Sequence, residues 1–80
     1  MPITTEVYRR ATETVTVMAS IDDEGAEIRV IHERDGEVLT DTIPEWGDDP
    51  QAGRRWVARH REARLAEGYQ LAEETEGPPR

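Results

Sequence analysis

The sequence predicts a single small α+β domain: a three- or four-stranded antiparallel sheet (a β-meander) with one C-terminal helix packed on one face. Polar and apolar residues alternate across residues 14–43, and a helical period replaces this alternation after Asp49. The chain has 80 residues, of which 35% are hydrophobic, so it supplies one thin core. We expect one domain over residues 1–80, with an ordered core over about 14–72 and a disordered tail over 75–80.

Three segments have the period of two that is typical of half-buried strands. TVTVMASI at 14–21 alternates, and so do residues 26–34 and 37–43. Asp35-Gly36 between the last two predicts a tight type I′ hairpin, because that turn needs positive φ at both central positions. Pro44 ends the third strand by removing a backbone donor. Residues 1–13 lack a clear alternation, and we expect a ragged lead-in there.

The helix is predicted from its boundaries and from one apolar stripe. Asp49-Pro50 is a typical helix start, and Gly68 is a typical stop, so the helix should run from Pro50 to about Glu67. We expect Trp56 to anchor the stripe on the sheet. The stripe consists of Ala52, Trp56, Val57, His60 and Ala63.

Two shorter segments flank the helix. After Gly68, the alternation of Tyr69 and Leu71 predicts a short fourth strand at a sheet edge. Before the helix, Trp46 is the only large apolar residue of its loop, and we expect it to cap one end of the core.

The composition excludes several classes of protein. There is no Cys, so the chain has neither a disulfide framework nor a thiolate metal site. No apolar run approaches the ~18 residues that span a bilayer. The segment MPITTEVYRR lacks the basic start and apolar stretch of a secretory signal. We therefore expect a cytoplasmic protein.

Residues that could carry chemistry do not form a recognisable constellation. His32 and His60 have no partner at metal-binding or acid–base spacing. The carboxylates of Asp22-Asp23-Glu24 and Asp48-Asp49 do not follow the spacing of a calcium loop and suit a turn and a helix cap. No phosphate-binding glycine motif or activated nucleophile is present. We expect no catalysis, no cofactor and no metal.

Charge is segregated along the chain, whose net charge is −8. Residues 1–50 hold thirteen acids and four Arg, whereas residues 51–66 hold five Arg and one Glu. An acidic β region therefore adjoins a basic helix. The overall charge disfavours direct binding to nucleic acid and favours a basic protein surface as the partner.

The acids of the two predicted hairpins are the first candidates for such a partner. Their density exceeds what turns and caps require. They are Asp22, Asp23, Glu24, Glu27, Asp35, Glu37 and Asp41. The alternative binding face is basic and lies on the helix; its members are Arg54, Arg55, Arg59 and Arg61. We expect these Arg residues to pair mainly with acids of the sheet or with Glu62.

The order of segments resembles that of small anti-CRISPR proteins of phages and mobile elements. TVTVMASI leads to the hairpin EIRVIHERDGEVLTDTI, then to the capped helix DDPQAGRRWVARHREARL and to GYQLAEE. The resemblance covers residues 14–72 as layout and charge, without a signature motif. It implies a non-enzymatic inhibitor that blocks target DNA recognition by a Cas protein or Cascade-type complex, with the acidic surface as a partial DNA mimic.

A second resemblance keeps an alternative open. Trp46-Gly47 before the helix and GYQ after it are similar to WGR-type nucleic-acid modules, although Asp48 replaces the Arg of that motif. This reading implies a nucleic-acid-associated domain that binds through the basic helix. A small housekeeping domain that is acidic only for solubility is the remaining possibility.

Overall fold

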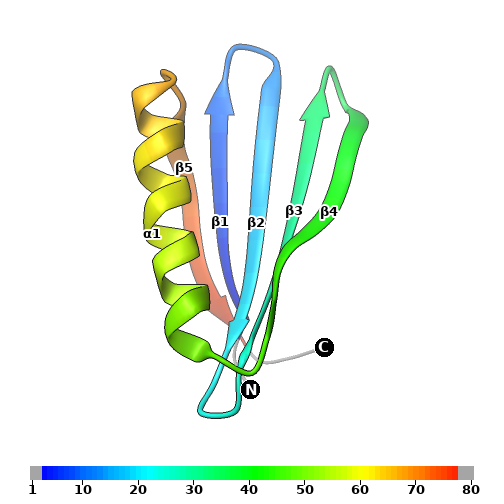
Figure 1. Ribbon diagram of the computed structural model, residues 1–80. Helices are drawn as coiled ribbons and strands as arrows, with labels where there is room; N and C mark the ends of the chain where they lie inside the picture. Colours follow the sequence, from blue (N-terminus) through cyan, green and yellow to red (C-terminus); the bar gives the residue numbers. More distant parts are fainter. Residues whose placement is uncertain (1–2, 78–80) are drawn as a thin grey trace.

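The structure is a computed structural model that describes residues 3–77. One five-stranded antiparallel sheet has the strand order β4-β3-β2-β1-β5, and a single helix packs on one of its faces (Figure 1). The α+β class and the antiparallel meander are confirmed, but the sheet has five strands and the helix is followed by a strand. The elements are β1 (Ile3–Arg10), β2 (Glu13–Ile21), β3 (Ala26–Arg34), β4 (Glu37–Gly47), α1 (Pro50–Ala66) and β5 (Gln70–Gly77).

The N-terminal segment is a full strand, so the prediction of a ragged lead-in is wrong. β1 lies between β2 and β5, and the consecutive residues Glu6, Val7 and Tyr8 are all buried. Glu6 and Tyr8 face the helix, whereas Val7 faces the other side. A buried carboxylate at an inward position hides the apolar alternation that would identify this strand from its sequence.

The C-terminal strand confirms the edge position predicted from Tyr69 and Leu71, but it is longer and pairs with β1. β5 runs to Gly77, so residues 75–77 of the expected tail are ordered in the sheet. The rest of that tail, residues 78–80, lies outside the described residues. Tyr69 is buried, and the guanidinium carbon of Arg10 lies 4.4 Å from its ring centre.

The turns follow local rules, with one exception. Asp35 and Gly36 have φ of 54° and 83°, which confirms the type I′ prediction. In the β2–β3 turn, the Asp22 carboxylate accepts from the backbone N–H groups of Glu24 and Gly25 at 2.8 and 3.0 Å. Ala11 is the exception: its φ of 52° is left-handed, although nothing in its sequence surroundings predicts that.

The helix boundaries agree with the predicted ones to within one residue. The Asp49 carboxylate accepts from the N–H of Gln51 at 2.9 Å and caps the first turn. At the other end, Gly68 has a φ of 90°, which terminates the helix in the expected left-handed conformation. No helix in the described part of the chain is long and apolar enough to cross a membrane.

The core lies between the helix and the inward face of the three central strands. Its fully buried side chains are Tyr8, Val15, Val17 and Ile28. Trp56 is half-buried and packs against this cluster, as expected, with its ring stacked on His60 at 4.8 Å. Trp46 does not cap the core, and that prediction is wrong: it lies on the edge strand β4 with 77% of its surface exposed.

Candidate functional site

Carboxylates from two distant segments gather at one end of the sheet, the lower end in Figure 1. The β2–β3 turn packs directly on the β4–α1 connection, because a Cβ at Gly25 would lie only 2.2 Å from the carbonyl oxygen of Gly47. Glycine at position 25 therefore permits this contact. We call the result the acidic pole; its members are Asp22, Asp23, Glu24, Glu27, Asp48 and Asp49.

Most of this acidic pole is not neutralised. Asp22 is engaged by turn amides, and Asp49 caps the helix with the Arg55 guanidinium 3.7 Å from its carboxylate. The other four carboxylates make no ion pair within residues 3–77. The pole therefore presents a locally negative surface that can attract cationic groups of a partner.

Trp46 lies beside two members of the acidic pole, Glu27 and Asp22. It lies opposite Glu27 in the β3–β4 register, and both residues line a shallow hollow of about 280 Å³ with Asp22 and Gly25. An exposed Trp beside carboxylates can accept the side chain of Arg or Lys, because the ring face attracts a cation while the acids neutralise it. Trp is also enriched among residues that dominate protein interfaces. Sequence reasoning missed this position, since exposure of Trp46 depends on tertiary packing.

The second group of predicted acids does not join the first. Asp35 and Glu37 lie at the far end of β3, about 30 Å away for a strand of nine residues. Asp41 is on the uncovered face of the sheet and forms a bidentate pair with Arg29 at 2.8 and 2.6 Å. This pair lowers the pKa of the Asp41 carboxyl. The seven predicted acids therefore form no continuous surface.

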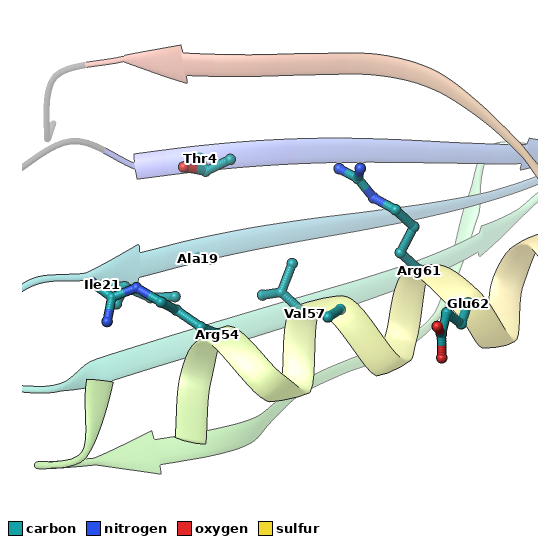
Figure 2. Close-up of a pocket in the computed structure, with 8 residues that line it drawn as sticks. Thr4, Ala19, Ile21, Arg54, Val57, Arg61 and Glu62 are labelled. Atoms are coloured by element: carbon teal, nitrogen blue, oxygen red, sulfur yellow. The ribbon is translucent and has the colours of Figure 1, made fainter. Parts of the chain in front are cut away.

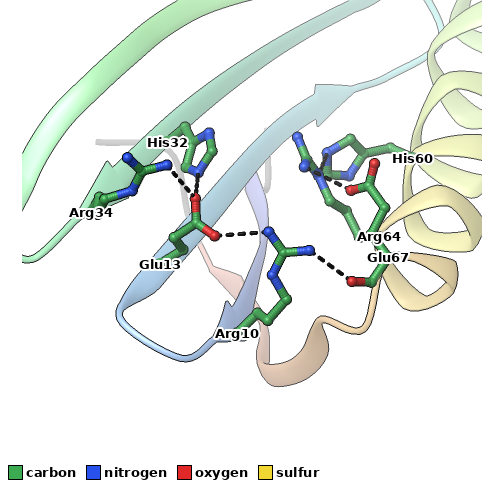
Figure 3. Close-up of polar contacts among 7 residues, drawn as sticks. All are labelled: Arg10, Glu13, His32, Arg34, His60, Arg64 and Glu67. Carbon is green, nitrogen blue, oxygen red and sulfur yellow. Dashed lines mark hydrogen bonds and ion pairs between the residues drawn. The ribbon is translucent and has the colours of Figure 1, made fainter.

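At the opposite end of the sheet, the Glu13 carboxylate is neutralised by Arg residues from two strands (Figure 3). The Glu13 carboxylate accepts from Arg10 at 2.8 Å and from Arg34 at 3.2 Å, and these contacts lower its pKa to about 2. His32 Nε2 is 3.2 Å from the same carboxylate. Arg10 also donates to the carbonyl of Glu67 at 2.8 Å, which ties the β1–β2 hairpin to the end of the helix.

The predicted basic face of the helix is only partly free. Arg61 does not pair with Glu62; it bridges Glu6 of β1 and Glu74 of β5 instead. Arg55 approaches Asp49, as noted above. Arg54 and Arg59 are exposed and have no ion-pair partner among the described residues. The helix thus offers two unpaired guanidinium groups.

Comparisons of the chain with protein-family models, with curated proteins and with solved structures found no significant match. The function is therefore inferred from the surfaces and buried groups of the structure. The most informative of these are the acidic pole and the polar groups between the helix and the sheet.

Glu6 is the only buried charged residue among residues 3–77, and its contacts hold the helix on the sheet. Its side chain accepts from the Tyr8 hydroxyl at 2.7 Å and from Arg61, so the charge is paired inside the interface. Burial and this hydrogen bond raise the pKa of Tyr8 to about 12. Sequence reasoning missed Glu6, because its partner Arg61 is 55 residues away.

The two His residues do not converge on a chemical site. His60 is stacked on Trp56, meets Tyr8 edge-on at 5.5 Å, and accepts a 3.0 Å hydrogen bond from Arg64. Burial and the nearby Arg64 lower the pKa of His60, so its ring is neutral at pH 7. Within residues 3–77, no group of three or more His, Cys, Asp or Glu side chains could hold a metal ion. This arrangement suits packing better than acid–base work.

Proposed function

We propose that the protein is a non-enzymatic binding protein that docks its acidic pole on a basic, nucleic-acid-binding surface of another protein. The observation that carries the proposal is the exposed Trp46 beside Glu27, at an end of the sheet where four carboxylates make no ion pair within residues 3–77. Bound in this way, the protein competes with nucleic acid for the partner. It needs no cofactor for this role.

The acidic pole and Trp46 contribute to binding in different ways. The carboxylates of the pole have the sign of a phosphate backbone, so they accelerate encounter with a basic surface and make binding sensitive to salt. Trp46 supplies a large apolar contact that slows dissociation once the surfaces meet. The packing of Gly25 on Gly47 and the Asp22 turn bonds hold the pole in place before binding, which reduces the entropic cost of association.

The resemblance in layout and charge suggests the kind of partner. Small anti-CRISPR proteins act on Cas proteins or Cascade-type complexes, and a basic DNA-binding channel of such an effector fits a compact acidic ligand. A location in the host cytoplasm belongs to the same proposal. The acidic pole is then a partial DNA mimic that copies the sign of the phosphates but not their regular spacing.

The test compares two charge reversals of equal size. Asp23→Lys with Glu24→Lys changes the pole, whereas Glu37→Lys with Glu62→Lys changes exposed acids outside it. Association with a purified Cascade-type complex is measured by surface plasmon resonance at low and high salt, together with DNA binding by the complex. We expect the first pair to slow association and the second to leave it nearly unchanged. Equal effects of the two pairs at low salt would contradict a role for the pole.

The unpaired Arg54 and Arg59 support one alternative, a nucleic-acid-associated domain of the WGR kind that binds through the helix. The variant Arg54→Glu with Arg59→Glu separates the two functions. If the protein binds DNA or RNA directly, and this variant abolishes that binding while the pole variant does not, the helix is the functional face. Under the main proposal, the same variant binds the protein partner as the parent does.

A further inference from the structure

A hollow of about 460 Å³ lies between α1 and the sheet, beside the first half of β1 (Figure 2). Its apolar wall consists of Ala19 and Ile21 from β2 with Val57 and Ala58 from the helix. Thr4 of β1 faces them from the other side. The volume is within the ~300–1,000 Å³ that is usual for small-molecule sites.

The hollow follows from an uneven distribution of side-chain size across the width of the helix. One row of helix residues packs closely on the sheet: a Cβ at Gly53 would lie 2.4 Å from the Cβ of Ala26, and the stacked rings of Trp56 and His60 meet the edge of Tyr8. The neighbouring row lies on the β1 side. Val57 of that row faces Thr4, Ala19 and Ile21 with no aromatic ring among them, so the space there stays open.

The charged groups at the hollow are not equivalent. Arg61 points toward β1, where Glu6 and Glu74 already neutralise it. The carboxylate of Glu62 points away from the sheet. Arg54 lies at the opposite end of the hollow from Arg61, next to Ile21, and has no ion-pair partner in the described part of the chain. The lining thus combines an apolar wall with one guanidinium that is free to bind an anion.

We infer that this hollow binds a small amphipathic carboxylate, with its hydrocarbon part against Val57 and Ala19 and its carboxylate on Arg54. A guanidinium binds a carboxylate through two parallel N–H···O bonds, which fixes the orientation of the ligand. Burial of the hydrocarbon part supplies the remaining affinity. This site is separate from the acidic pole and does not depend on the function proposed for it.

The test uses decanoate as the probe and decyltrimethylammonium as a probe of equal chain length and opposite charge, both below the concentration at which micelles form. Binding is followed by the shifts of backbone amide signals in NMR spectra. We expect saturable shifts with decanoate that cluster at Ala19, Ile21 and Val57. Arg54→Gln should weaken binding about threefold to fivefold, as loss of an exposed ion pair predicts, whereas Arg59→Gln, which also changes an exposed Arg but lies outside the hollow, should not.

A third variant tests the location of the hydrocarbon part. Ala58 is exposed at the rim of the hollow, so we expect the Ala58→Trp variant to fold normally. Its indole ring should fill the hollow and abolish decanoate binding. The inference is overturned if decanoate causes no saturable shifts, if the cationic probe binds equally well, or if Arg54→Gln or Ala58→Trp binds decanoate as the parent does. Charge reversal at Asp23 and Glu24 should leave decanoate binding unchanged, which separates this site from the acidic pole.

Discussion

Removal of one hydroxyl group tests the buried polar contact between the sheet and the helix. The Tyr8 hydroxyl donates to the Glu6 carboxylate at 2.7 Å, and the two residues are 0% and 3% exposed. Tyr8→Phe keeps the ring and its packing but leaves a buried charge with one donor fewer. Hydrogen bonds to charged groups contribute about 1.5–3 kcal/mol, so we expect the free energy of unfolding to fall by about 2 kcal/mol.

The matched control is Tyr69→Phe. Tyr69 is also buried, at 3% exposure, but its hydroxyl makes no hydrogen bond to residues 3–77. Urea unfolding gives the free energy of unfolding of both variants and thermal unfolding gives their Tm, each followed by Trp fluorescence. We expect Tyr69→Phe to change stability by less than about 0.5 kcal/mol and Tyr8→Phe to lower Tm by roughly 8–16 °C. Equal losses in the two variants would refute the reasoning.

The pH dependence of stability provides a second measurement of the same contact. The pKa of Tyr8 is about 12 in the folded protein, against the ordinary 10.0. Between these values the unfolded chain loses the proton while the folded chain keeps it, so stability must fall as pH rises. A shift of this size corresponds to at most about 2–3 kcal/mol. Tyr8→Phe should lack this part of the alkaline loss, and an identical pH profile in both proteins would contradict the assignment.

Three further substitutions test the backbone and the core, each by urea unfolding. Ala11→Gly should raise stability by about 1 kcal/mol, because Ala11 has a φ of 52° that glycine adopts without strain; a loss would show that the turn is not left-handed. Gly53→Ala should destabilise the protein although alanine has the better helix propensity, since the new Cβ would lie 2.4 Å from that of Ala26. A gain in stability of about 1 kcal/mol, as helix propensity alone predicts, would exclude this close contact. Trp56→Ala should lower the free energy of unfolding by about 2–3 kcal/mol, which is less than for removal of a fully buried Trp, because the ring is half-buried. A variant as stable as the parent would place Trp56 outside the core.

Features that depend on neighbouring residues could be predicted from the sequence. The alternation of β2 and β3, the type I′ turn at Asp35-Gly36 and the helix between Asp49 and Gly68 all follow from local steric and hydrogen-bonding rules. Four acids of the pole, Asp22 to Glu24 and Glu27, were also identified, since a turn and the strand after it fix their positions.

Features that depend on distant residues could not be predicted. The sequence of β1 shows no clear alternation, because one of its inward positions is the charged Glu6. That carboxylate can be buried only because Arg61 of the helix pairs with it. Asp48 belongs to the acidic pole, and Trp46 lies beside the pole, because the backbone of Gly25 packs on that of Gly47. Local sequence determines which hydrogen bonds and side-chain periods each segment can form. Whether a charge is buried, paired or exposed is a property of the assembled sheet and helix, because burial and pairing depend on groups that only the folded chain brings together.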